Sequence, residues 1–506
     1  MEYIFGDIAH RSELPPLSWN PDSQNCQNPH MLMTGTSGSG KTSMLLDIVR
    51  YLDVIRKHIF IFDLKGDMVI KDNSDNVIGN YIEFTAWNSE YGINPFEFDT
   101  GVSEEELKEI IANDCKMTKE QQFKIQNSGP KVQINRIVEM IKKNFLPNMG
   151  AGQRDILMYL FADTYLSKGF KYDDVSTWLN DVPNLQDTLD LIDKINSYFN
   201  GGIYLVNSEA EDFIMGMHKE IVKLKPFQTK LSTLIQLEAE DVKEDDSKLN
   251  RDELEKHIKE RRDKISELVD KYVSYGVDTL NDEQSLNNKE WFDSKSIQLK
   301  KYETKDAIRT MLKMQSYINA LVDSGVFHSK RPPVKAGLNI INISGLDVEI
   351  QRFIVDIWLG KVFKSCKIRG TYMERENRTR GDKCDTYVII DESKLIAGTS
   401  RDKNNPYSYL NRIATEARGF GLGIVVAAQS AEHFPPEFLK NFHTQVILST
   451  STADADAVRK SFGIDKELLK YTEKIWGNGL IKTGRVFNMA RLNALLKIKQ
   501  DTEIGE

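Results

Sequence analysis

The chain has 506 residues, of which 40% are hydrophobic and 28% are charged, a balance that excludes collagen-like and disordered proteins. Its length corresponds to about three domains of ordinary size. Lys and Arg number 67 against 75 for Asp and Glu, which gives a net charge of −8, so any basic surface for nucleic acid must be local.

The composition also bears on the cellular compartment. The chain has four cysteines, Cys26, Cys115, Cys366 and Cys384. They stand far apart, without the paired spacing of a zinc site or a disulfide framework. The longest apolar runs, such as Ile424 to Ala428, are shorter than the ~18 residues that identify a membrane span, and residues 1–13 lack a signal-peptide pattern. We therefore expect a cytoplasmic chain with no membrane span.

The first regular pattern along the chain is a strand–helix–strand unit. Residues 1–28 are rich in turn-forming residues and contain one short strand candidate, Tyr3 to Phe5. A strand is then predicted over 31–34, followed by a glycine-rich turn, a helix over 41–52 and a second strand over 58–63. A βαβ unit of this kind predicts a parallel sheet.

Helical periodicity dominates the middle of the chain, from Val102 to Phe327. Apolar residues recur on one face of a helix over 308–322, for example. Residues 248–273 are densely charged and carry apolar residues near heptad spacing. This pattern favours a helical hairpin or short coiled coil, and a solvated helix face is the alternative.

Strand patterns return after Pro333. The predicted strands cover residues 338–344, 386–392, 423–429 and 445–450. Their near-continuous apolar composition indicates burial on both faces, as in a parallel sheet. The sequence therefore predicts an α/β fold, in which residues 1–101 and 331–506 form one core with a mainly parallel sheet. Residues 102–330 are expected to form an inserted, mainly α-helical domain.

The strongest motif is a phosphate-binding loop. It consists of Gly35, Thr36, Ser37, Gly38, Ser39, Gly40, Lys41 and Thr42. This is a full match to GxxxxGK[ST] between a strand and a helix, the context that the motif requires. Its glycines let backbone N–H groups face a phosphate. We expect Lys41 to reach the β- and γ-phosphates of ATP and Thr42 to ligate Mg²⁺, whereas an accidental Gly-Ser turn is disfavoured by this context.

The partner motif is the apolar run 387–390, which ends in Asp391 and Glu392. Asp391 is expected to hold Mg²⁺ through water, and Glu392 to polarise the attacking water. An acid in this position favours hydrolysis over phosphoryl transfer to a small acceptor, because a general base must lie within hydrogen-bond reach of the water. Together the two motifs predict an ATPase.

Three further residues are candidates for the same chemistry. Gln429 closes the predicted strand 423–429, at the sheet edge where ligands bind in open α/β folds. It is a candidate γ-phosphate sensor, with an ordinary strand-end glutamine as the alternative. Arg412 and Arg418 lie on a helical segment before that strand. With one nucleotide site per chain, either is a candidate arginine finger for a neighbouring subunit, and a surface salt bridge is the alternative.

These motifs resemble those of the HerA/FtsK superfamily of ring-forming ATPases. The resemblance is carried by residues 28–32 running into the phosphate loop, 62–67 (FDLKGD), 93–96 (INPF) and 417–429, with support from 343–346 and 476–479. The INPF segment is more similar to the HerA and conjugation-ATPase branches than to FtsK itself.

The resemblance implies a RecA-like P-loop ATPase core that assembles into a hexameric ring. Such a ring grips DNA in its central channel and couples hydrolysis of ATP, with Mg²⁺, to translocation. The resemblance also favours Arg418 over Arg412 as the finger that acts in trans.

A motor that follows duplex DNA needs cationic side chains in its channel. It can ignore the base sequence, because phosphate contacts carry no base information. The loop after Glu392 contains Lys394, Arg401 and Lys403 and is the candidate pore loop, with a solvated surface loop as the alternative. A second basic cluster at 375–380 is interspersed with acids and is interpreted as a solvated linker.

The leading hypothesis is an ATP-hydrolysing, helicase-like DNA translocase that forms a hexamer on double-stranded DNA without sequence preference. Since no nuclease motif is visible, we expect a separate nuclease or effector as partner, in DNA processing or antiviral (anti-phage) defence. The alternatives are a conjugation or type IV secretion ATPase and an ATP-controlled assembly switch that activates a partner.

Overall fold

The computed structural model describes residues 1–11, 13–23, 25–71, 76–199, 283–374, 383–392, 409–430, 434, 436–451, 454–474 and 476–496. The predicted heptad segment 248–273 lies outside these ranges. The chain forms two compact units, one made of Met1–Thr188 with Met314–Glu506 and the other of Leu189–Lys313.

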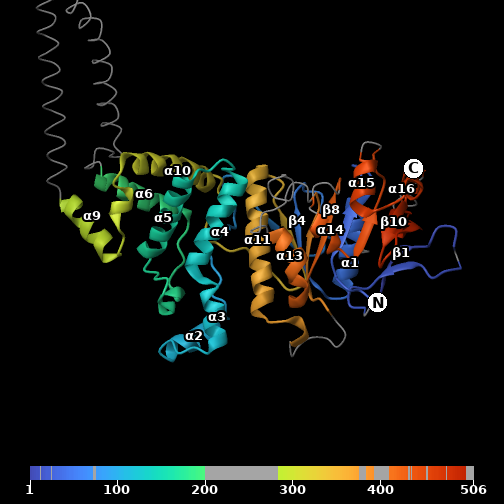
Figure 1. Cartoon of the computed structure of the whole chain (residues 1–506), viewed down its shortest axis with the longest axis horizontal. Coiled ribbons are helices and arrows are strands. Elements are labelled where there is room, and N and C mark those ends of the chain that lie inside the picture. The colour runs from blue at the N-terminus through green and yellow to red at the C-terminus, as the bar shows by residue number, and fades with distance from the viewer. Residues whose placement is uncertain are drawn as a thin grey trace, which may run out of the picture. The chain divides into compact units, whose positions relative to one another are not determined.

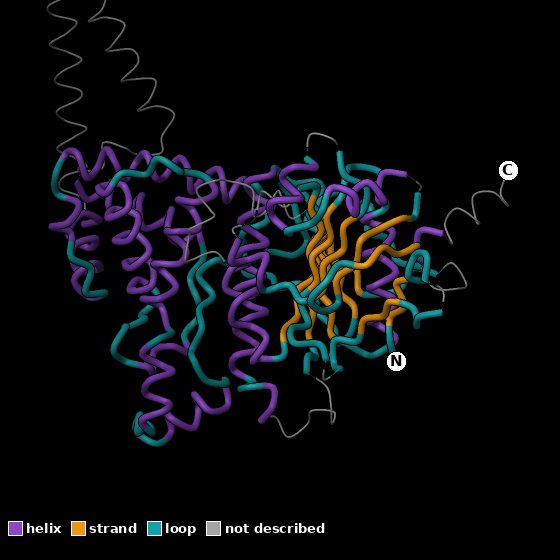
Figure 2. Tube along the Cα trace, turned by 45° about the vertical axis from the view of Figure 1, so that its right-hand side comes forward, coloured by secondary structure: helices purple, strands orange, loops and turns teal. Residues whose placement is uncertain are grey.

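The described part of the first unit contains a nine-stranded sheet in the order β11-β10-β9-β3-β8-β7-β4-β6-β5, whose strands Figure 2 shows side by side. Its strands are β3 (Met31–Thr34), β4 (His58–Asp63), β5 (Asn80–Glu83), β6 (Leu338–Asn342), β7 (Thr386–Ile390), β8 (Leu422–Ala428), β9 (Thr444–Ile447), β10 (Asn478–Lys482) and β11 (Asn488–Arg491). From β9 to β5 all neighbours run parallel, whereas β10 pairs antiparallel with β9 and β11. The predicted α/β fold with a mainly parallel sheet is confirmed.

The strand predictions differ from the structure in two ways. First, four strands end earlier than predicted, namely β6 at Asn342, β7 at Ile390, β8 at Ala428 and β9 at Ile447. Asp391 and Glu392 therefore stand in the turn beyond β7. Second, β5, β10 and β11 were not predicted. In β5 only Ile82 is buried, because β5 is the outermost strand at one end of the sheet. Such a strand lacks the apolar run that is typical of an interior parallel strand.

A small antiparallel hairpin precedes the sheet. It pairs β1 (Tyr3–Gly6) with β2 (Leu17–Trp19), of which only the first was predicted. Tyr3, Phe5 and Trp19 are buried in the main hydrophobic core. The N-terminal residues therefore form part of the core, although their composition is typical of turns.

Helices cover both faces of the sheet. On one face, α1 (Lys41–Val54) buries Met44, Leu45 and Ile48 in the same core as β3 and β4. On the other face, Trp358 of α11 (Val348–Ile368) contacts the rings of Phe60 and Phe62, with ring centroids 5.9 and 6.3 Å apart. The two helices lie on opposite sides of the strands (Figure 1).

Further helices of the first unit flank this core. They are α2 (Glu104–Ala112), α3 (Lys119–Gln126), α4 (Gly129–Asn144), α5 (Ala151–Ser167), η1 (Val175–Leu179), η3 (Tyr372–Glu374), α13 (Tyr409–Glu416), η5 (Ala417–Phe420), α14 (Pro436–Lys440), α15 (Ala455–Phe462) and α16 (Lys466–Lys474). Lys143 of α4 forms an ion pair of 2.9 Å with Asp356 of α11, and the two side chains are only 7% and 2% exposed. This buried contact joins α4 to the core, so the compact units divide at residues other than the expected boundaries of 102 and 330.

The second unit contains helices and no strand among its described residues. Its elements are α6 (Leu185–Phe199), α9 (Glu283–Ser294), η2 (Leu299–Tyr302) and α10 (Lys305–Asp323), of which α6 and α10 continue into the first unit. Ile192, Ile195 and Phe292 are buried, and the Lys194 ammonium lies 4.1 Å from the ring centroid of Trp291. None of the helices in the described ranges of the chain combines the length and the apolar content that spanning a bilayer demands.

Candidate nucleotide-binding site

The phosphate loop joins the carboxyl end of β3 to the first turn of α1. Gly38 and Gly40 have φ values of 74° and 90°, a conformation that side chains other than glycine rarely adopt. A Cβ atom on Gly35 would lie 2.6 Å from Oγ of Ser39, so a larger residue there would clash. The loop therefore brings its backbone close to the N-terminus of α1, where anions are stabilised.

Lys41 extends back over this loop. Its ammonium donates to the carbonyl oxygens of Gly35 and Thr36, at 2.8 and 2.7 Å. Burial lowers the pKa of Lys41, and the nearby carboxylates of Asp391 and Glu392 act in the opposite direction. A phosphate oxygen would be a stronger partner for this ammonium than two neutral carbonyls.

The two predicted motifs meet at Thr42 and Asp391. Oγ1 of Thr42 donates to Oδ2 of Asp391 at 2.8 Å, although the residues are 349 positions apart. The other carboxylate oxygen of Asp391 accepts from the backbone N–H of Glu392 at 2.8 Å. A hydroxyl and a carboxylate are oxygen ligands of the kind that Mg²⁺ prefers, so the donor set fits the predicted metal.

Glu392 occupies a strained position directly beside Asp391. Its φ is 55°, which costs a residue other than glycine about 1 kcal/mol. Its side chain is 7% exposed and accepts from the Lys65 ammonium at 2.7 Å, and the Gln429 side chain also hydrogen-bonds to it. Burial opposes ionisation, but these partners outweigh it, so the pKa of Glu392 is lowered.

Lys65 is a site residue whose role the sequence motifs do not predict. It stands in the turn after β4, where Oδ1 of Asp63 accepts from the N–H groups of Lys65 and Gly66 at 3.1 and 2.7 Å. Gly66 has a φ of 82°, so the turn needs glycine at this position. The FDLKGD motif therefore forms a turn that places Lys65 beside Glu392. The sequence feature that could have identified Lys65 is this polar turn directly after a buried strand.

Strand order explains why Gln429 joins the site. Because β8 lies between β3 and β7, the residue that follows β8 stands between the phosphate loop and Glu392. Gln429 is that residue, one position beyond the strand end at Ala428. Its contact with Glu392 places it at the sheet edge expected from the sequence.

The two candidate finger residues differ in their surroundings. Arg412 pairs with Glu416 at 3.3 Å and lies 5.6 Å from the ring centroid of Phe363. Arg418 is exposed in η5, at the start of β8, and no ion pair holds it among the described residues. The start of β8 is at the edge opposite the phosphate loop, so Arg418 lies away from the site of its own chain.

Lys394, Arg401 and Lys403 of the predicted pore loop lie outside the described residues. So does the basic cluster at 375–380.

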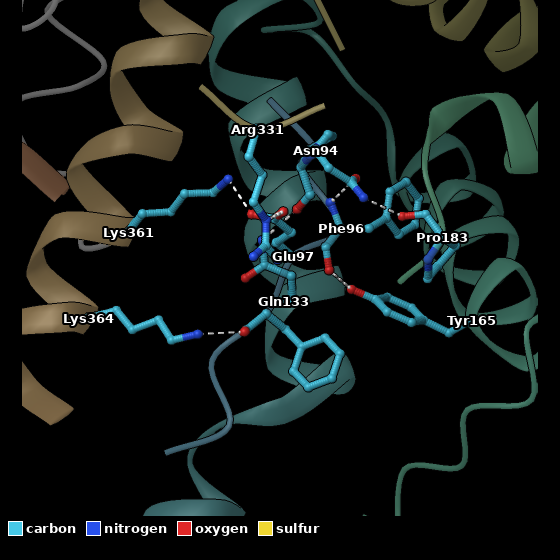
Figure 3. Close-up of polar contacts among 11 residues, drawn as sticks. Asn94, Phe96, Glu97, Gln133, Tyr165, Pro183, Arg331, Lys361 and Lys364 are labelled. Carbon is cyan, nitrogen blue, oxygen red and sulfur yellow. Dashed lines mark hydrogen bonds and ion pairs between the residues drawn. The ribbon is translucent and has the colours of Figure 1, made fainter. Parts of the chain in front are cut away.

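The INPF segment lies in a separate polar network (Figure 3). Its Asn94 donates to the carbonyl of Pro183 at 2.8 Å, and Gln133 donates to the carbonyl of Pro95 at 2.7 Å. The Tyr165 hydroxyl donates to the carbonyl of Phe96. We call the network around residues 94–99 the INPF junction; it joins the segment after β5 to α4 and α5.

Charged side chains, two of them from α11, contact the same junction. Glu97 forms an ion pair with Arg331 at 2.7 Å and another with Lys361 of α11. Lys364, one turn later, donates to the carbonyl of Phe98 at 2.7 Å. Burial favours the neutral form of Glu97, but its two cationic partners prevail and lower its pKa.

Sequence comparisons identify relatives that act on DNA. The sequence model of a family described as the type IV secretion-system coupling protein DNA-binding domain matches residues 16–80. The chain is 26% identical over 170 residues to the DNA double-strand break repair helicase HerA of Sulfurisphaera tokodaii, covering 33% of this chain and 32% of that protein. It is 25% identical over 213 residues to the HerA helicase of Pyrococcus furiosus, covering 38% and 37%. The chain thus matches about a third of the length of these curated relatives.

The fold is similar to a solved structure over nearly the whole chain. VirB4 of Thermoanaerobacter pseudethanolicus superimposes with a TM-score of 0.53 at 11% sequence identity, and the match covers 97% of this chain and 96% of that one. The two proteins therefore share a fold.

Proposed function

We propose that the chain is a P-loop ATPase of the HerA/FtsK type, related to the conjugation ATPases, and that it hydrolyses ATP to move along DNA. The observation that carries the proposal is the meeting of separate motifs at one sheet edge. Thr42 reaches Asp391 at 2.8 Å, and Lys65 reaches Glu392 at 2.7 Å. These contacts assemble cation, metal-ligand and base functions in one place.

The proposed chemistry assigns one task to each side chain. Lys41 and the loop amides hold the phosphates, and Thr42 and Asp391 hold Mg²⁺, which supplies charge neutralisation when bound. Glu392 accepts a proton from the attacking water while the water oxygen bonds to the terminal phosphorus and the bond to the bridging oxygen breaks. Gln429, hydrogen-bonded to Glu392, orients that water.

A ring completes the site in this proposal. Arg418 is exposed at the edge opposite its own phosphate loop, so it serves a neighbouring subunit as the arginine finger, and a hexamer repeats this interface. We expect Arg418→Ala to lower the ATPase rate about 10³-fold. Mixing this variant with Lys41→Ala should restore part of the rate, because a mixed interface combines an intact loop with an intact finger. Arg412→Ala is the control and should keep the wild-type rate by itself, and failure of the Arg418 mixture to recover would refute action in trans.

Movement along DNA is tested by displacement of a third strand from a long duplex. We expect the wild-type chain with ATP to release a triplex-forming oligonucleotide placed far from the duplex ends, and Glu392→Gln to leave it bound. ATP hydrolysis without release would refute translocation and favour the nucleotide-controlled assembly switch.

The match of residues 16–80 to a coupling-protein domain favours a second candidate, an ATPase of a conjugation or type IV secretion system. This candidate predicts co-purification with a membrane complex and an ATPase rate that added DNA alone does not raise. The first candidate predicts stimulation by DNA alone.

The finer parts of the proposal concern the substrate and the pathway. We infer a double-stranded, sequence-independent substrate and a separate nuclease or effector, in DNA processing or anti-phage defence. Both inferences are supported by the resemblance of segments of this sequence to the HerA family. Reconstitution with the products of neighbouring genes would test the partner directly.

A further inference from the structure

Trp476 lies against the phosphate loop, although it is far from that loop in sequence. It stands in the turn before β10, and its side chain is 43% exposed. A Cβ atom on Gly40, the residue that caps α1, would lie 3.3 Å from Cη2 of Trp476 and 2.5 Å from Cδ2 of Leu495. Leu495 is buried in the main core, so Trp476 is the part of this contact that remains open to a ligand.

The order of strands indicates which end of a bound nucleotide lies near Trp476. Around the phosphate loop the order is β10-β9-β3-β8-β7, so Glu392, after β7, and Trp476, before β10, flank the loop on opposite sides. In the proposed function Glu392 activates the water that attacks the terminal phosphate, so this phosphate lies on the β7 side. The other end of the nucleotide, with its base, then extends toward the β10 side.

The indole of Trp476 has the chemistry that a nucleobase requires. Its large apolar π-face stacks on purines without reading their hydrogen-bonding edges. A half-exposed tryptophan also loses unfavourable contact with water when a base covers it. We propose that Trp476 is the platform on which the purine base of the bound nucleotide stacks. This inference rests on the proposed ATPase function and adds the binding site for the base.

Affinity measurements with two ligands separate stacking from support of the loop. Calorimetry would compare a non-hydrolysable ATP analogue with tripolyphosphate, which has the phosphates but no base, both with Mg²⁺. We expect Trp476→Ala to weaken binding of the ATP analogue on the order of tenfold, or ~1.4 kcal/mol, and to leave tripolyphosphate binding unchanged. Trp476→Phe should keep most of the affinity, because it retains an aromatic face.

Trp87 provides the matched control. It is 80% exposed and follows β5, at the opposite end of the sheet from β10. Tryptophan fluorescence should change on addition of the ATP analogue in the wild-type chain and in Trp87→Phe, and this change should disappear in Trp476→Phe.

The outcomes are distinguishable. Wild-type affinity for the ATP analogue in Trp476→Ala would overturn stacking while leaving the ATPase proposal intact. Equal loss of affinity for the ATP analogue and tripolyphosphate would show that Trp476 only supports the loop, which also overturns stacking. A wild-type chain that binds neither ligand would overturn the proposed function, and this inference with it.

Discussion

The INPF junction and the nucleotide site around Glu392 contain similar polar groups, but these groups have different kinds of hydrogen-bond partners. At the junction, the carbonyls of Pro95, Phe96 and Phe98 each accept from a long side chain of another element. At the carboxyl ends of the parallel strands, Lys41 donates, within the described ranges, to carbonyls of its own loop. Glu392 pairs with Lys65, whose side chain is 43% exposed, and hydrogen-bonds to Gln429.

This difference in partners distinguishes polar groups that stabilise the fold from polar groups that are available to a ligand. A network that joins several elements loses stability when one member is removed, because buried partners such as Asn94, Gln133 and Tyr165 are left unpaired. Groups paired within one loop, or with a half-exposed lysine, can exchange those partners for a ligand at little cost. We therefore expect substitutions at the nucleotide site to change activity and substitutions at the junction to change stability.

The largest effect is expected for Glu392→Gln. The amide keeps the shape of the side chain but cannot accept the proton of water, so the ATPase rate should fall by a factor of about 10³. Nucleotide should stay bound, and the melting temperature should stay near that of the wild-type chain. Rapid-quench kinetics and calorimetric melting of the same sample measure both quantities. A normal hydrolysis rate would remove Glu392 from the role of general base.

At the junction, Glu97→Gln should act on stability. The substitution removes the carboxylate from Lys361, whose side chain is 33% exposed, and we expect a loss of about 1 kcal/mol in the free energy of unfolding. The ATPase rate per folded molecule should not change. Glu104→Gln is the control, because its exposed ion pair with Lys108 should not affect denaturant unfolding. A Glu97→Gln chain of wild-type stability and reduced rate would contradict the contrast between the two regions.

The smallest effect is expected from Lys65→Met, which should change the pH dependence of the ATPase rate. The Lys65 ammonium lowers the pKa of Glu392 against the opposing effect of burial. Without Lys65 the carboxylate takes up a proton at higher pH, so the acid limb of the ATPase profile should move to higher pH. Lys108→Met, which removes an exposed ion pair elsewhere, should leave the profile unchanged. An unmoved limb in Lys65→Met would mean that this contact does not control the ionisation of Glu392.

The sequence predicts those parts of the site that are encoded locally. The phosphate loop and the acids after β7 are contiguous motifs, and the residue types in each limit what the segment can do. The role of Lys65 is different, because it depends on β4 and β7 being neighbours in the sheet, with 327 positions between Lys65 and Glu392. Such a pairing is set by strand order, which a single sequence does not reveal.

The same distinction applies to the fold. Interior parallel strands such as β8 carry long apolar runs and are predicted, whereas β10 (NGLIK) contains few apolar residues. The expected boundary at residue 102 follows a change in periodicity. The observed units follow contacts instead, such as the buried pair of Lys143 and Asp356, which join helices that lie far apart in the sequence.

The most direct measurement is the steady-state ATPase rate with and without long double-stranded DNA over a series of salt concentrations, with the particle mass determined in parallel. A DNA-translocating ring should be stimulated strongly by the duplex, and the stimulation should fade as salt weakens the phosphate contacts, in a particle of hexameric mass. A rate that is the same with and without DNA at every salt concentration would contradict the proposal that hydrolysis at this sheet edge drives movement on DNA.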